Sequence, residues 1–150
     1  MKKITKIWFD GEWLYGRGDD NVVYRQSMLW YKRLMEASDD ERKKFEFSTI
    51  GIHWPDLNVD VSFESFLYEE AEPSALQRFF LTHPEINISG FAARCGINAT
   101  LLRNYINGFK KPSPERTDEI LDSIHKLGED LLAVSFSRTA PAAGGGEASF

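Results

Sequence analysis

Several polar side chains in the second half of the chain have the types and spacing that hydrogen bonding to nucleic acid requires. Thr100, Arg103 and Asn104 follow one another closely, and Lys110 and Lys111 come shortly after. An Arg side chain can bond guanine, an Asn side chain can bond adenine, and the methyl group of Thr can contact that of thymine. Lys side chains neutralise backbone phosphates. The pattern therefore favours contact with a DNA duplex.

Two short helices joined by a tight turn are predicted over residues 88–108 to position these side chains. Ala92 is small where the two helices approach each other, and Gly96 stands at the turn, where a left-handed backbone is often required. Asn98 can cap the second helix, predicted over residues 99–107, by accepting hydrogen bonds from its first free amides. The side chains predicted to face inward are mostly apolar: Phe91, Cys95, Ile97, Leu102 and Tyr105.

The predicted DNA-binding residues lie outside this inward face or in the loop that follows it. They are Ser89, Ala99, Thr100, Leu101, Arg103, Asn104, Asn107, Lys110 and Lys111. No Asp or Glu occurs between residues 86 and 114, whereas Arg94 adds a further positive charge there. An outward face that is short of acids and rich in Arg, Asn and Thr suits base edges and phosphates.

Residues 74–134 resemble the lambda-repressor-like (Cro/C1-type) helix-turn-helix DNA-binding domains. The resemblance rests on the two-helix segment and on Asn107-Gly-Phe-Lys-Lys-Pro-Ser-Pro114, which is similar to that family's loop before its fourth helix. It implies an all-α domain whose recognition helix, residues 99–107, enters the major groove. The sequence departs from the family at Ile88, where the family often has Gln and commonly makes a contact with it.

The charge balance of the whole chain does not favour DNA binding. The 150 residues carry a formal net charge of −5, which taken alone argues against nucleic-acid binding. The acidic residues are concentrated in residues 39–41, 56–72 and 115–130, however, outside the predicted interface. A basic strip on an acidic protein can combine DNA binding with solubility.

Cysteine usage and hydropathy indicate the compartment. Cys95 is the single cysteine, so no disulfide can form within the chain. The N-terminus has no sustained apolar signal segment, and no run approaches the about 20 apolar residues that span a bilayer. We expect a cytoplasmic protein.

The N-terminal residues 1–72 predict a small α+β domain built on an antiparallel β-meander. Runs of β-branched and aromatic residues between turn residues predict strands over residues 4–9, 12–15 and 22–25. Apolar residues at helical spacing predict a helix over residues 28–35.

The middle of this domain mixes clear and ambiguous signals. Ser38 and Glu41 fit a capping box that opens a short helix. The predicted elements after it are a strand over 45–50, a loop with a short extended segment over 51–62, and either a strand or a helical turn over 63–68.

This first domain is similar to a bacterial domain-of-unknown-function family, number twenty-four forty-two. The resemblance is carried by Arg25-Gln-Ser-Met-Leu29, Arg33-Leu-Met-Glu-Ala-Ser-Asp39, Ile52-His-Trp-Pro55, Leu57, Asp60 and Ser62. The family offers no established activity. Some relatives are encoded beside small partner proteins and have been grouped with antitoxins, and others carry a helix-turn-helix after this domain.

An imidazole and two carboxylates, those of His53, Asp56 and Asp60, fall within one predicted loop and invite an enzymatic interpretation. Loop capping explains them more simply, because no nucleophile or second His lies nearby. His83 and His125 are distant in the sequence and show no metal-ligand spacing. We predict no catalytic residue, no metal site and no cofactor, and we expect that the protein is not an enzyme.

The four tryptophans, Trp8, Trp13, Trp30 and Trp54, all belong to the first domain. Two interpretations remain open for them. They can fill a small core with large side chains, or some of them can form an exposed patch that binds a partner.

The second domain is predicted over residues 73–134, after an acidic turn that contains Pro73. A helix over 74–81 must end before Pro84, because the residue before a proline avoids the α region. Ser113 and Pro114 begin a long helix that Gly128 can split into two. Residues 135–150 are of low complexity, and we predict a disordered tail.

These features together predict a sequence-specific DNA-binding transcriptional regulator. Its N-terminal domain would serve dimerisation or partner binding, and two copies would read two half-sites, so we expect a homodimer on double-stranded DNA. The alternative is an antitoxin-like protein-interaction module that neutralises a small partner protein, with DNA binding vestigial or autoregulatory. Ile88 and the negative net charge favour that alternative.

Overall fold

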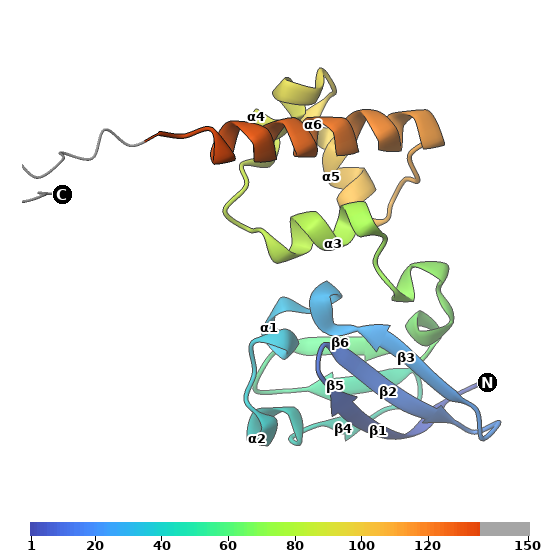
Figure 1. Cartoon of the computed structure of the whole chain (residues 1–150). Helices are drawn as coiled ribbons and strands as arrows, with labels where there is room; N and C mark the ends of the chain where they lie inside the picture. The colour runs from blue at the N-terminus through green and yellow to red at the C-terminus, as the bar shows by residue number, and fades with distance from the viewer. Residues whose placement is uncertain (136–150) are drawn as a thin grey trace, which may run out of the picture. The chain divides into compact units, whose positions relative to one another are not determined.

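The computed structural model describes residues 1–135, and the fold is mixed α+β (Figure 1). Backbone contacts divide the chain into two units, Met1–Lys111 and Pro112–Phe150, of which the second is described as far as residue 135. The predicted boundary between residues 72 and 73 stays a prediction. The predicted disordered tail, apart from Ser135, lies outside the described residues.

The first antiparallel sheet has the strand order β1-β2-β3. Its strands are β1 (Ile4–Asp10), β2 (Trp13–Gly18) and β3 (Val23–Ser27). Gly11 turns the chain between the first two strands with a φ of +57°, a left-handed value that costs glycine little. The predicted meander is confirmed, and β2 continues past its predicted end because Gly16 and Arg17 still pair with both neighbouring strands.

A second antiparallel sheet has the order β4-β5-β6 and consists of β4 (Glu46–Phe47), β5 (Gly51–Trp54) and β6 (Val59–Ser62). The prediction of a loop with a short extended segment over residues 51–62 was therefore wrong for Gly51–Trp54, which form a strand, whereas β6 confirms the extended segment. Ile52 pairs with Val61, and Trp54 pairs with Val59, so that all four side chains point to the buried face. This alternation is the period-two pattern of a half-buried hairpin. The predicted strand over residues 45–50 shrinks to the two residues of β4.

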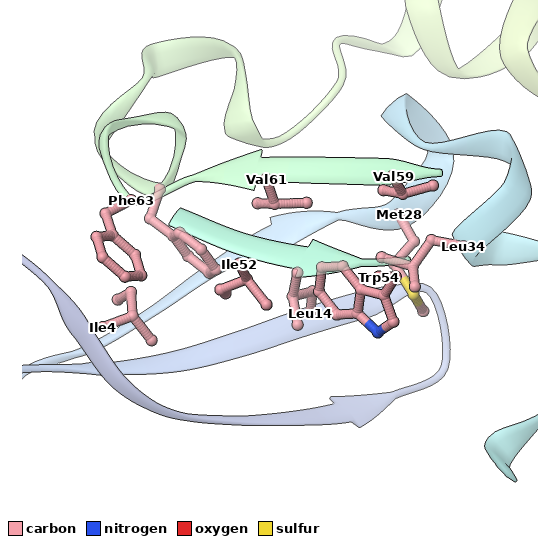
Figure 2. Packing of buried hydrophobic residues seen from close by; sticks show 10 residues of the cluster. Ile4, Leu14, Met28, Leu34, Ile52, Trp54, Val59, Val61 and Phe63 are labelled. Carbon is pink, nitrogen blue, oxygen red and sulfur yellow. The ribbon is translucent and has the colours of Figure 1, made fainter. Parts of the chain in front are cut away.

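The core of the first unit lies between these two sheets, where apolar side chains of both sheets meet (Figure 2). Its buried members include Ile4, Leu14, Met28, Leu34, Ile52, Trp54, Val59, Val61, Phe63 and Phe66. Trp54 is fully buried, whereas Trp8, Trp13 and Trp30 are half-buried. The core interpretation is therefore confirmed for Trp54, whereas partner binding by the other three tryptophans stays a prediction.

Short helical segments connect the strands. They are η1 (Met28–Trp30), α1 (Lys32–Met35), α2 (Asp39–Arg42), η2 (Glu64–Leu67) and η3 (Glu69–Ala71). The single helix predicted over 28–35 is interrupted at Tyr31, whose φ of −129° and ψ of 80° are not helical. The capping box at α2 is confirmed, because Ser38 and Glu41 each bond the backbone amide of the other.

Three further helices complete the first unit: α3 (Ala75–Thr82), α4 (Ile88–Cys95) and α5 (Ala99–Asn107). α3 ends before Pro84, as predicted. The second unit holds α6 (Pro114–Leu132), which Ser113 caps and which runs unbroken through Gly128. Among residues 1–135, no helix has both the length and the apolar character that crossing a membrane would require.

Candidate nucleic-acid interface

Helices α4 and α5 each begin at an asparagine cap. The Oδ1 atom of Asn87 accepts from the amide of Gly90 at 3.1 Å, and Asn98 Oδ1 accepts from Thr100 at 2.8 Å. α4 ends at Cys95, and Gly96 follows with a left-handed φ of 72° at the start of a three-residue connection to α5. The predicted roles of Gly96 and Asn98 are both confirmed.

Helix α3 holds this helix pair from behind. Gln77 Nε2 donates to the backbone oxygen of Tyr105 near the end of α5, at 3.1 Å, and the Gln77 side chain is buried. The rings of Phe80 and Phe91 meet edge to face with centroids 5.2 Å apart, which joins α3 to α4. Buried contacts of this kind leave the opposite side of α5 free to carry the polar side chains.

The predicted interface residues divide into two sets by exposure. Six side chains are exposed: Ser89, Thr100, Arg103, Asn107, Lys110 and Lys111. Three are half-buried, namely Ala99, Leu101 and Asn104. The inward face is only partly as expected, since Phe91, Leu102 and Tyr105 are buried but Cys95 and Ile97 are half-buried.

Arg103 does not extend freely from α5. Its Nη2 atom donates to the Oγ atom of Ser89 on α4 at 2.9 Å. The bond crosses from the middle of the second helix to the first turn of the first one. Both residues were predicted to contact DNA, but their bond to each other was not predicted from the sequence.

The segment after α5 bends back toward the helix. Gly108 ends α5 with a left-handed φ of 80°, and the amide of Lys110 donates to the backbone oxygen of Asn104 at 3.2 Å. This bond ties the backbone of Lys110 to the last turn of α5. The side chains of Lys110 and Lys111 are both exposed.

One acidic side chain meets this basic segment in the fold. The Oε1 atom of Glu69, in η3, lies 3.4 Å from Lys111 Nζ, and both side chains are more than four-fifths exposed. The absence of acids between residues 86 and 114 thus holds along the sequence but not in space. Any anion that bound Lys111 would have to compete with Glu69.

Of the three side chains that could have formed an active site, His53, Asp56 and Asp60, only two lie close together. His53 and Asp60 face each other across β5 and β6, with Nδ1 and Oδ1 2.6 Å apart. Asp56 lies in the turn between the strands and is exposed. Cross-strand pairing accounts for the contact between His53 and Asp60. Among residues 1–135, no group of three or more His, Cys, Asp or Glu side chains could hold a metal ion.

A pocket of about 350 Å³ was not foreseen from the sequence. Gln26, Tyr31 and Ser65 form its polar wall, and Asn107 and Phe109 close another side. The one local signal was Gln26, a polar residue on the inward side of β3, which is buried beside Leu14. The other members come together only in the folded chain.

Comparison with known proteins supports the family resemblance that was predicted for the N-terminal domain. Residues 4–73 match a family described as "Protein of unknown function (DUF2442)", which confirms the resemblance of the N-terminal part. The match ends before α3 begins at Ala75. No curated protein and no solved structure matches the chain.

Proposed function

We propose that the protein is a sequence-specific DNA-binding regulator in which α4 and α5 act as a lambda-repressor-like helix-turn-helix. α5 would lie in the major groove as the recognition helix, and α4 would cross the backbone. The N-terminal sheets would provide dimerisation or partner binding.

The observation that carries the proposal is the exposed polar side of α5. Thr100, Arg103 and Asn107 are exposed at a spacing of three and four residues, so they lie along one side of the helix. The buried hydrogen bond from Gln77 holds the end of α5 from the other side. A helix fixed by its apolar side and bare on its polar side has the form that major-groove reading requires.

Four of the exposed residues have a role that fits their chemistry. Arg103 would bond a guanine or a phosphate, and Thr100 would contact a thymine methyl group. Lys110 and Lys111 would neutralise phosphates just beyond the recognition helix. Asn104 is half-buried, so its contact with adenine would use the part of the side chain that remains exposed.

A single motif of this kind reads few bases, so useful specificity calls for two copies. Two such helices on a twofold axis would bind half-sites about 34 Å apart. The proposal therefore includes a homodimer and a palindromic site.

Selection of bound fragments from random duplex DNA, at physiological salt and with the purified protein, tests the proposal. A palindromic consensus with half-sites about one helical turn apart would support both binding and dimer symmetry. The matched control is a variant with Thr100, Arg103 and Asn107 all replaced by Ala, which should enrich no consensus. Equal recovery of all fragments by the unaltered protein would refute sequence-specific binding.

The antitoxin-like alternative draws on a separate observation. Phe47 in the two-residue strand β4 and Ile50 beside it are exposed, Ile50 by 77%. Exposed apolar residues next to a short sheet edge suit a protein partner. A small protein that copurifies in equal amounts, and is lost when Ile50 is replaced by Asp, would favour this function; DNA binding could then be autoregulatory.

A further inference from the structure

The pocket of about 350 Å³ lies between β3 and the η1, η2 and η3 segments on one side and the end of α5 on the other. All its lining residues belong to the first unit. The volume is at the small end of the range of about 300–1,000 Å³ that small-molecule sites occupy.

Aromatic side chains form a large part of the lining. Trp30, Tyr31, Tyr68 and Phe109 all contribute to it. Two of them retain much exposed surface, since Tyr68 is 50% and Phe109 is 81% exposed. An exposed Phe at the mouth of an aromatic pocket leaves ring surface that an occupant can cover.

Two hydrogen bonds hold the aromatic wall in place. Trp30 Nε1 donates to the backbone oxygen of Glu70 at 2.8 Å, and the hydroxyl of Tyr31 donates to Gln26 Oε1 at 2.8 Å. Gln26 in turn donates from Nε2 to Ser65 Oγ at 2.9 Å, and both of these side chains are buried. The rings of Trp30 and Tyr31 are therefore oriented before any ligand binds, which lowers the entropic cost of binding.

The pocket carries negative charge only. Glu70 is the single charged residue among those that line it. Within residues 1–135, the backbone oxygen of Glu70 is bonded but its carboxylate has no hydrogen bond or ion pair. The Glu70 side chain lies next to Gly108, another lining residue, since a Cβ atom at Gly108 would stand 3.7 Å from Glu70 Cγ. A carboxylate at an aromatic pocket attracts a cation, and the faces of Trp and Tyr rings attract it further.

We propose that this pocket binds a small aromatic cation, with its ring between the aromatic side chains and its positive group at Glu70. An indole that carries an ethylammonium group has suitable chemistry. Its positive charge would meet the carboxylate, and its ring would be covered by Phe109.

The site also touches the candidate nucleic-acid interface. Asn107 and Phe109 line the pocket, and Lys110 follows immediately in the chain. An occupant would hold the segment from which Lys110 and Lys111 reach phosphates. A change in DNA affinity on ligand binding rests on the proposed function, whereas the binding site itself does not.

Isothermal titration calorimetry with tryptamine as the probe tests the site on the full chain. We expect saturable binding of one molecule per chain, weakened roughly five- to tenfold in Glu70→Gln and in Phe109→Ala. Tryptophol, the neutral alcohol of the same shape, should bind more weakly than tryptamine by a similar factor. Glu85→Gln and Leu132→Ala remove a matched charge and a matched exposed apolar side chain outside the pocket, since Leu132 is 89% exposed, and both should bind as the unaltered protein does.

Three outcomes would overturn the proposal: no saturable binding up to about 10 mM probe, equal binding of tryptamine and tryptophol, or equal binding by the pocket variants and the controls. Circular dichroism of each variant shows that a loss of binding is not a loss of folding. Because calorimetry needs no DNA, a protein that fails to bind DNA can still bind tryptamine. Unchanged DNA affinity at saturating tryptamine would refute the coupling alone.

Discussion

Arg103 on α5 and Ser89 on α4 are joined by a hydrogen bond of 2.9 Å from Nη2 to Oγ. Both side chains are exposed, so the bond lies on the surface that we propose for DNA. It orients a guanidinium group whose position would otherwise be set only by its own flexible side chain. A pre-oriented guanidinium loses less conformational entropy when it bonds a base or a phosphate.

Replacing Ser89 by Ala removes this orientation while it retains the positive charge. We expect weaker binding to the selected consensus duplex, but by less than the roughly 1–3 kcal/mol expected for Arg103→Ala if Arg103 reads a base. Fluorescence anisotropy measures both affinities. Arg103→Ala should also relax one position of the site, and equal affinities for Arg103→Ala and the unaltered protein would remove Arg103 from the interface.

Replacing Lys110 and Lys111 together by Ala removes two phosphate contacts from each protomer. For the unaltered dimer, three or four contacts per protomer predict a slope of log K against log salt of about −5 to −7. The double variant should bind all sequences more weakly and show a flatter slope. Lys43 and Lys44 are a neighbouring exposed pair at the end of α2, and their double Ala variant is the matched control. A slope unchanged by the Lys110 and Lys111 replacements would contradict their role.

Replacing Glu69 by Gln removes the acidic competitor of Lys111. Because the pair is exposed, we expect an increase in DNA affinity of only about two- to threefold. The increase should vanish when Lys111 is already Ala, which a double-mutant cycle measures. Glu46→Gln makes the same charge change on β4, and an equal gain from it would show that the effect is one of net charge only.

Trp54 should be the tryptophan whose loss costs most stability. Its side chain is fully buried and its Nε1 atom donates to the backbone oxygen of Arg42 at 2.9 Å. Trp54→Ala should lower the free energy of unfolding by about 3–5 kcal/mol. Trp8 is half-buried and stacks on Tyr15, so Trp8→Ala should cost less in the same urea titration. The reverse order would contradict the described core.

The carboxylate of Asp20 should titrate below its ordinary range. The hydroxyl of Tyr24 donates to it at 2.5 Å and lowers the pKa of Asp20, and the same bond raises the pKa of Tyr24. Since the folded-state pKa of Asp20 is depressed, its contribution to stability is present above the unfolded pKa and is lost as pH falls through the folded one. In Tyr24→Phe, NMR titration should show the pKa of Asp20 moving upward; an unchanged pKa would contradict this hydrogen bond.

Features that depend on neighbouring residues could be predicted from the sequence. The capping box of Ser38 and Glu41 is one, and the left-handed turn at Gly96 followed by the cap at Asn98 is another. Each is specified within four residues, so local hydrogen bonding and backbone sterics decide it. For the same reason, the bounds of α4 and α5 could be predicted closely from the sequence.

Features that depend on distant pairing were missed. The alternation of Ile52, Trp54, Val59 and Val61 is visible in the sequence, but Pro55 and Asp56 interrupt it and suggested a loop. The turn of this hairpin includes Asn58, which has a positive φ of 51°, a conformation that Asn adopts more readily than most residues. The contact of Glu69 with Lys111 joins residues 42 apart and depends on how the first unit folds.

The central claim is that the polar side of α5 contacts DNA, and mapping of backbone amide shifts tests it most directly. The labelled protein is titrated with a duplex that carries the selected consensus, or with a mixed-sequence duplex if selection yields none. We predict that the largest shifts fall on residues 89, 99–107 and 110–111, and that the variant lacking Thr100, Arg103 and Asn107 side chains shows much smaller ones. Shifts confined to the two β-sheets, or none at all, would contradict the account.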